Sequence, residues 1–259
     1  MPCHSGIIGG VAAAAIAALG IGPRAHAQNV YVFSTDNING NVNDALQATL
    51  TAQGFNVTMG VRANLFDGSI SLAGYDAVFM TCSLFSPFAV PNVAGQQQLV
   101  DFVNAGGGLV TSEILNYMHY HFSSVHALFP ILPATYPGWG PHNSATTFSL
   151  ITPDPIMNAG LPASFAIPNS LGDGEYRLAP KAGATEFYRS SNTGGAGVVG
   201  WDAGAGRVAS LSHQFSNTGV ITDANYAQLL GNTVRWVIPA PGAAALLGLG
   251  GLLAARRRR

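Results

Sequence analysis

The most constraining feature of the sequence is a regular alternation between short apolar, β-branched segments and segments with helical periodicity. Apolar runs at residues 30–33, 55–59, 75–82 and 109–111 have the length and composition of buried strands. Between them, residues 41–53 and 96–104 place apolar side chains at helical spacing, and glycines end both segments. Strands that alternate with helices through short turns predict a parallel sheet covered by helices on both faces.

The same pattern returns near the C-terminus, where runs at 197–201 and 207–212 precede a helix that begins at Asp223. Between the two halves, residues 127–195 contain nine of the 15 prolines and little periodic apolar sequence. We expect this stretch to be a loop-rich insertion with short strands at most. The chain has 259 residues, 48% of them hydrophobic, which is enough for one three-layer α/β domain over residues 28–237.

Charged side chains are scarce, since only 9% of residues are Asp, Glu, Lys or Arg, against about 25% in an average soluble protein. Arg24 and the terminal run Arg256–Arg259 supply five of the 11 basic residues, so the body holds six basic against 12 acidic side chains. A mildly acidic body without a basic face is not suited to neutralising phosphates. We therefore expect no nucleic-acid partner.

The N-terminal segment has the features of a leader. Residues 7–22 are apolar and uncharged, and Ala25-His26-Ala27 follows them. A short apolar stretch before a small-x-small site is typical of a signal peptide that signal peptidase removes. The alternative is a buried N-terminal helix, but the glycines of this stretch favour a leader. We expect residues 1–27 to be a signal peptide, the protein to be exported, and Gln28 to be the mature N-terminus.

The C-terminal segment 238–259 combines Pro239-Ala240-Pro241, an uncharged stretch at 243–255 and four arginines. At 1.5 Å per residue this stretch spans about 20 Å, short of the ~30 Å hydrocarbon core, yet apolar residues followed by arginines form a stop-transfer pattern. The whole tail resembles the PEP-CTERM sorting signal, with Ala240 where that signal usually has Glu. The resemblance implies transient anchoring in the inner membrane by a transmembrane helix, cleavage by an exosortase-type enzyme, and release to the cell surface or the extracellular space.

Four short motifs in the body occur in an order that resembles one family. They are the helix, glycine turn and strand at 102–110, the segment 154–162, Gly174-Glu175-Tyr176, and 204–208 followed by Ser212-His213. Together they resemble the class I glutamine amidotransferase-like domains, particularly the trehalose-utilisation (ThuA-like) branch, over residues 29–237. Asp154 stands where this branch has histidine, and Ser212 where it has glycine. The resemblance implies a three-layer, flavodoxin-like α/β fold.

The resemblance also directs attention to the end of the strand at 109–111. Amidotransferases carry a nucleophilic Cys on a tight strand-to-helix turn, but residues 110–114 contain neither Cys nor flanking Gly, so we expect glutamine hydrolysis to be lost. Glu113 and His213 each follow a predicted inner strand, and ligands bind at the carboxyl ends of such strands. We expect Glu113 and His213 to be catalytic and Ser112 to bind ligand. The alternatives are a helix N-cap for Ser112 and stabilisation of Glu113 by the helix dipole.

Histidine and aromatic residues supply the remaining candidates. On a strand, His119 and His121 would point the same way and could share a divalent metal, whereas on a helix they would diverge. A metal site using these two histidines with His142 or His213 is one hypothesis, and aromatic packing is the other. Trp139 and His142 lie in the insertion and are candidate ligand-binding residues, because aromatic rings stack on sugars, although they also cover sheet edges.

Two functions are consistent with these features. The first is an exported cell-surface or matrix protein whose ThuA-like domain binds a carbohydrate-like small molecule, with no cofactor. The second is a secreted hydrolase that acts on a sugar or an ester through Glu113 and His213, with a divalent metal as an optional cofactor.

Overall fold

The computed structural model describes residues 27–35, 41–81, 90–138, 144–168, 174–213, 215 and 217–239. Residues 1–26 of the expected signal peptide and residues 240–259 of the expected sorting tail lie outside this part of the chain. Within the described residues, no helix is both long and apolar enough to cross a membrane.

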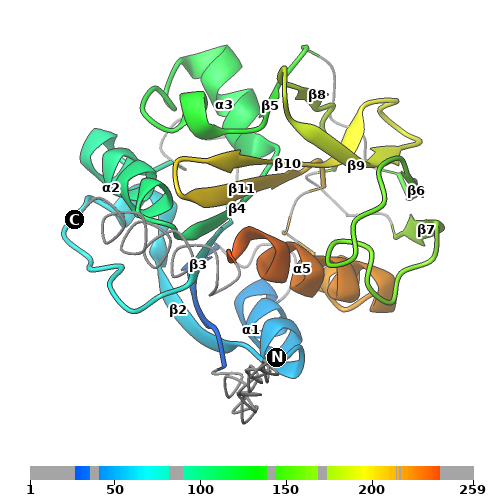
Figure 1. The fold of residues 1–259 in the computed structure, drawn as a ribbon, viewed down its shortest axis with the longest axis horizontal. Coiled ribbons are helices and arrows are strands. Elements are labelled where there is room, and N and C mark those ends of the chain that lie inside the picture. The colour runs from blue at the N-terminus through cyan, green and yellow to red at the C-terminus, as the bar shows by residue number, and fades with distance from the viewer. Residues whose placement is uncertain are drawn as a thin grey trace, which may run out of the picture.

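A nine-stranded sheet with the order β2-β1-β3-β4-β11-β10-β9-β6-β7 forms the centre of the domain (Figure 1). The first five strands in this order are parallel: β2 (Asn56–Arg62), β1 (Asn29–Ser34), β3 (Ala77–Met80), β4 (Gly108–Ser112) and β11 (Gly206–Leu211). Each of the other four is antiparallel to its neighbours: β10 (Ala196–Ala203), β9 (Thr185–Ser190), β6 (Thr146–Leu150) and β7 (Ser164–Ile167). The expected α/β fold is confirmed, and its parallel half contains both strands that precede Glu113 and His213.

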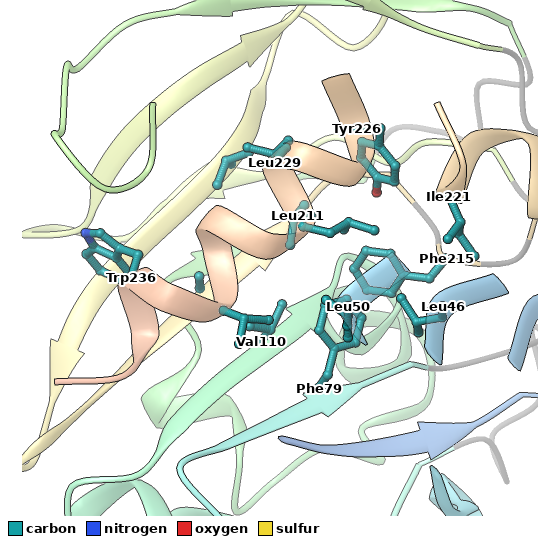
Figure 2. Close-up of a cluster of buried hydrophobic side chains, with 14 of the residues drawn as sticks. Leu46, Leu50, Phe79, Val110, Leu211, Phe215, Ile221, Tyr226, Leu229 and Trp236 are labelled. Carbon is teal, nitrogen blue, oxygen red and sulfur yellow. The ribbon is translucent and has the colours of Figure 1, made fainter. Parts of the chain in front are cut away.

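Helices cover both faces of the sheet and make the three layers. One face carries α1 (Val42–Ala52), α4 (Thr218–Ile221) and α5 (Ala224–Val237), and the other carries α2 (Val93–Asn104) and α3 (Ile114–Phe122). Neighbouring side chains of β4 point to opposite faces, so Val110 packs in the first core while Leu109 packs in the second. Figure 2 shows the first core, where Phe79 and Val110 lie beneath the residues of α5. The smaller elements are η1 (Ala63–Leu65), η2 (Phe129–Ile131) and a two-stranded sheet of β5 (Ala134–Thr135) and β8 (Ala179–Pro180).

Helix boundaries follow capping chemistry. The carboxylate of Asp223 accepts hydrogen bonds from the backbone N–H groups of Asn225 and Tyr226 at 3.1 and 3.0 Å, which fixes the start of α5 where the sequence predicts it. Asn41 precedes α1 but does not cap it, because its side chain bonds Asp44 instead. The helix predicted at 96–104 begins earlier, at Val93, because Asn92 caps it through the N–H of Gly95 at 2.9 Å.

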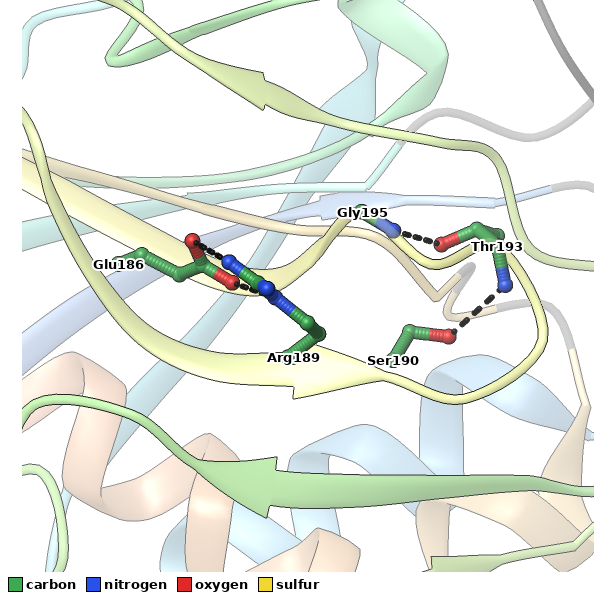
Figure 3. Close-up of polar contacts among 5 residues, drawn as sticks. All are labelled: Glu186, Arg189, Ser190, Thr193 and Gly195. Atoms are coloured by element: carbon green, nitrogen blue, oxygen red, sulfur yellow. Dashed lines mark hydrogen bonds and ion pairs between the residues drawn. The ribbon is translucent and has the colours of Figure 1, made fainter.

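One expectation about the second half of the chain is wrong. The run at 207–212 forms β11, which is parallel to β4 as predicted, but the run at 197–201 forms β10, which is antiparallel to β11 because only Gly204 and Ala205 separate the two strands. The insertion 127–195 contains the short strands β6, β7 and β9, which extend the central sheet. Its β9–β10 turn is held by side chains: Ser190 and Thr193 accept backbone N–H groups at 3.4 and 3.1 Å (Figure 3).

Candidate functional site

Buried polar side chains gather where β4 and β11 end. Leu211 pairs with Ser112 in the register of these two neighbouring strands, so Glu113 and the Ser212-His213 pair leave the sheet side by side. Ser112, Glu113 and Ser212 are fully buried, and His213 is 1% exposed. The structure therefore places the two expected catalytic residues just beyond the ends of two adjacent inner strands, at the carboxyl edge of the parallel half, where α/β sheets bind ligands.

A second carboxylate, Glu175, joins this group. Glu175 forms an isolated antiparallel bridge with His213, and the N–H of Tyr176 donates to the carbonyl oxygen of Ser212 at 3.1 Å. The hydroxyl of Ser212 donates to Oε1 of Glu175 at 2.5 Å, and Glu175 is fully buried. We refer to Ser112, Glu113, Glu175, Ser212 and His213 as the polar cluster.

The environment favours a neutral form of Glu175. Burial raises the pKa of its carboxyl group, and hydrogen bonds from Ser212, Ser190 and Thr146 only partly oppose the rise. Tyr226, in the first turn of α5, closes the cluster from the side of the first core: its hydroxyl donates to the carbonyl oxygen of His213 at 3.3 Å. Burial and the charges of Glu113 and Glu175 together raise the pKa of Tyr226 far above its usual range. Both carboxylates therefore lie near one tyrosine hydroxyl.

Unsatisfied polar atoms accompany the cluster. Oγ of Ser112 and both side-chain polar atoms of Asn116 are buried without a hydrogen-bond partner among the described residues. Ser112 lies at the end of β4 and does not cap α3, whose N-cap position is occupied by Glu113. Buried polar atoms without partners are rare in folded proteins and point to sites that take a ligand or water.

The turn that carries Glu113 is not a nucleophile elbow. Its backbone angles are φ −60° and ψ −23°, which any residue adopts at the start of a helix. A nucleophile elbow holds its catalytic residue in a strained conformation. The side chain at this position is thus a buried acid on an unstrained turn.

Aromatic rings extend from the polar cluster to the surface along α3. The ring of Tyr117 lies 4.9 Å from that of Tyr176, 5.5 Å from that of Tyr136 and 4.3 Å from that of His121. Tyr176 is fully buried next to Glu175, whereas Tyr120 at the outer end, 5.3 Å from Tyr136, is 59% exposed. We refer to Tyr117, Tyr120, His121, Tyr136 and Tyr176 as the aromatic cluster.

The two histidines proposed as metal ligands are not brought together. Both lie on α3, where His119 stacks on Phe129 with centroids 3.6 Å apart, while His121 packs against Tyr117. The described residues contain no group of three or more His, Cys, Asp or Glu side chains arranged to hold a metal ion. His126, and not His121, lies near His119, at 6.0 Å between centroids.

The other candidates of the sequence are placed as follows. Trp139 and His142 lie outside the described residues. A groove of about 520 Å³ lies at the opposite, amino end of the parallel strands, lined by Asn29, Phe55, Asn56 and Tyr75 among others, so it is separate from the polar cluster.

Sequence reasoning missed three members of the site, Glu175, Asn116 and Tyr226. The motif Gly174-Glu175-Tyr176 resembles the ThuA-like branch, but the resemblance alone does not place Glu175 beside His213.

The raised pKa of Glu175 predicts how stability depends on pH. An unfolded Glu175 ionises near 4.5, while the folded protein keeps the proton to a higher pH. Between these two values the folded state binds more protons, so this group makes the free energy of unfolding fall as pH rises, until the folded carboxyl has ionised. Urea unfolding of Glu175→Gln across this range should show a smaller fall than wild type. Glu186→Gln, which changes an exposed ion pair, serves as control, and equal slopes for all three proteins would contradict the assignment.

Comparison with known proteins supports the fold. The sequence matches no protein-family model and no curated protein. The structure is similar to cytoplasmic protein STM1381 from Salmonella typhimurium LT2, with a TM-score of 0.62 and 12% identity over 82% of this chain and 100% of that one. It is also similar to a ThuA-like protein from Parabacteroides merdae (TM-score 0.58, 14% identity, 82% and 90% covered) and to a glutamine amidotransferase from Thermotoga maritima (0.56, 10%, 83% and 100%). At these identities the likeness shows a ThuA-like and amidotransferase-like fold, and it shows no activity.

Proposed function

We propose that this domain binds a small, carbohydrate-like molecule at the carboxyl edge of β4 and β11, in a protein that is exported. One observation carries the proposal: the buried polar cluster adjoins the aromatic cluster, because Glu175 of the first and Tyr176 of the second are consecutive residues. A sugar presents hydroxyl groups that need donors and acceptors, and C–H faces that pack on aromatic rings. The two clusters supply both kinds of contact at one place.

Binding is tested with a panel of mono- and disaccharides, using ligand-observed NMR or calorimetry on residues 28–237. We expect Tyr120→Ala to weaken binding about 3- to 10-fold, because one exposed ring contributes about 0.5–1.5 kcal/mol beyond burial. The thermal midpoint should change little, since the Tyr120 side chain is 59% exposed. Leu65→Ala, an equally exposed side chain distant in the sequence, is the control. Full affinity in Tyr120→Ala would remove the aromatic cluster from the site.

A hydrolase is the second candidate, and the two buried carboxylates favour it. The raised pKa of Glu175 suits a general acid, whereas Glu113 lies at the N-terminus of α3, where the helix dipole favours a carboxylate anion. Glycosidases divide acid and base or nucleophile roles between two such groups. Turnover of chromogenic glycosides or esters, abolished by Glu113→Gln, would select the hydrolase, and binding without turnover would select the binding domain. A metal assay on the same protein tests the optional divalent ion.

Export and sorting are proposed from the two ends of the chain. Signal peptidase would cut after Ala27, and an exosortase-type enzyme would remove the tail after about Val237, leaving a surface or extracellular protein. Intact mass spectrometry of protein from its native host should show a start at Gln28 and no terminal arginines. Protein that mainly retains Arg256–Arg259 would contradict processing of the tail. Neutral residues in place of the four arginines should impair retention in the membrane before cleavage.

A further inference from the structure

Among the described strands, β2 and β7 form the two ends of the central sheet, and Figure 1 shows them on opposite sides of the molecule. The outer edge of an end strand presents backbone N–H and C=O groups that can pair with another chain. β7 is protected from such pairing, because it has only four residues and lies between Pro162 and Pro168. β2 is longer, with seven residues, and contains neither proline nor lysine.

Two contacts show which backbone groups of β2 face its neighbour β1. The N–H of Asn56 donates to the carbonyl oxygen of Gln28 at 2.9 Å, and the carbonyl oxygen of Gly60 accepts a hydrogen bond from the hydroxyl of Ser34. Gln28 directly precedes β1, and Ser34 ends it. Since the backbone groups of a strand alternate between its two sides, the N–H and C=O of Thr58 face β1 as well.

The same alternation directs the N–H and C=O groups of Val57 and Met59 to the outer edge of β2. The side chains of these two residues pack against the first core, whereas Thr58 is exposed. The regular edge ends before Val61, whose N–H donates to the hydroxyl of Tyr31 at 3.1 Å. Two neighbouring outward residues on either side of Thr58 therefore offer donors and acceptors in one uncharged stretch.

The segments that flank β2 in the chain pack on the two faces of the sheet. The ring of Phe66 lies 5.0 Å from that of Phe33 and 6.2 Å from that of Tyr31, so residues 63–66 turn onto the face that carries α2. α1 packs on the other face, where Leu50 belongs to the first core. Within the described part of the chain, no strand pairs with the outer edge of β2.

We propose that β2 pairs with β2 of a second copy of this chain, antiparallel and about a two-fold axis at Thr58. In this register Val57 lies opposite Met59 of the second copy, and the two residues exchange both backbone hydrogen bonds. The two-fold axis repeats this exchange, so every outward group of the stretch gains a partner. Thr58 lies opposite its own copy in a non-hydrogen-bonded pair, where side chains are closest and two threonines interact favourably.

The charges at the ends of the paired strands are complementary. Arg62 is exposed and is the only charged residue of β2, and the register places it opposite Gly54 of the second copy. The groove of about 520 Å³ lies beside this position, since residues 55–58 and Asn29 help to line it. The exposed carboxylate of Asp76 adjoins the groove, because it accepts the N–H of Asn29 at 2.7 Å. The pairing thus brings a cation of each copy to an anionic corner of the other.

Sedimentation velocity of residues 28–239, which contain every described strand and helix, tests the pairing. We expect monomer and dimer in exchange, with the dimer fraction rising from micromolar to millimolar protein, because a short strand pair forms a small interface. Over the same range, hydrogen exchange should slow at the amides of Val57 and Met59 and not at that of Thr58, which faces β1. A monomer mass at every concentration, or a dimer without slower exchange at these two amides, would overturn the proposal.

Charges introduced at position 58 test the two-fold register. Thr58→Lys and Thr58→Glu each place like charges opposite one another, so each should weaken association at least about tenfold. An equimolar mixture of the two variants should restore the dimer, because opposite charges then face each other. Ala166→Lys puts the same charge on an exposed residue of the other end strand, β7, and should leave association unchanged. Wild-type association in Thr58→Lys, or a mixture that stays monomeric although circular dichroism shows both variants folded, would contradict the proposal.

This inference does not depend on the function proposed above, because it uses no residue of the polar cluster or the aromatic cluster. The loss of either one leaves the other standing, since sugar binding and sedimentation are measured separately.

Discussion

A methyl group added at Gly206 is expected to cost this protein about 3 kcal/mol of stability or more. A Cβ atom there would lie 2.1 Å from the carbonyl oxygen of Gly107 and 2.5 Å from that of Val103. Both atoms belong to the backbone, where β11 starts beside the end of α2 and the turn before β4, so no side chain can rotate away. Relief would require the two central strands to separate.

Urea unfolding of Gly206→Ala measures this cost. Gly219→Ala is the control, because its Cβ would meet only the side chain of Asn217, at 3.3 Å, and its stability should stay within about 1 kcal/mol of wild type. An unfolding midpoint of Gly206→Ala equal to that of wild type would show that β4 and β11 are less closely packed than described. If Gly206→Ala does not fold while Gly219→Ala does, the added methyl group costs more than the stability of the whole domain, which also agrees with the prediction.

The second large effect is expected at the polar cluster. Glu113→Gln and His213→Asn should each lower the affinity for a bound sugar about 10- to 100-fold, because a hydrogen bond to a charged group contributes about 1.5–3 kcal/mol. Glu113→Gln keeps the side-chain size, so its thermal midpoint should fall by no more than a few degrees. His213→Asn keeps a polar group but removes part of a buried ring, so its midpoint should fall further, and its binding is measured well below that midpoint. The measurement is calorimetric titration with the tightest ligand of the sugar panel.

A carboxylate outside the cluster provides the matched control. Glu186 pairs with Arg189 at 2.8 Å on β9, where the arginine side chain is 53% exposed (Figure 3). Glu186→Gln removes the same charge and should leave sugar affinity unchanged. Wild-type affinity in the double variant of Glu113 and His213 would leave the cluster with a structural role only.

The parallel half of the fold was predictable because its signals are local. Strands β1, β3 and β4 are continuous apolar runs bounded by turns, and capping by Asp223 fixes the start of α5. The placement of Glu113 and His213 follows from the same reasoning, since residues after parallel neighbours must leave the same sheet edge. These features can be predicted from the order of strands and helices along the chain.

The antiparallel half was missed for two different reasons. The hairpin β10–β11 carried a usable signal, because two residues between strands are too few for a parallel crossover and suit a tight turn at Gly204, where φ is 59°. Strands β6 and β7 carried a weaker one, since β6 alternates buried and exposed residues over only five positions. Within the described part of the insertion, no proline lies inside β6, β7 or β9, so the prolines did not argue against these strands as strongly as their number suggested.

The members of the site that sequence reasoning missed are joined by long-range contacts. Glu175 reaches His213 through a single bridge between segments 38 positions apart, and Tyr226 reaches it from another helix. Sequence periodicity does not predict such long-range contacts, because they depend on how the antiparallel half of the sheet is placed relative to the parallel half.

The pairing of β4 with β11 also determines when this protein can complete its fold. Thr111 and Ser210 are hydrogen-bonded at 2.7 Å although 99 positions separate them, so β4 lacks one neighbour until nearly the whole domain has been synthesised. Until then the growing chain presents an open strand edge flanked by apolar side chains, the kind of surface that promotes aggregation. Closing so long a loop makes folding slow compared with a chain of local contacts. During synthesis, the exposed edge of β4 must therefore be protected from pairing with other chains until β11 has been made.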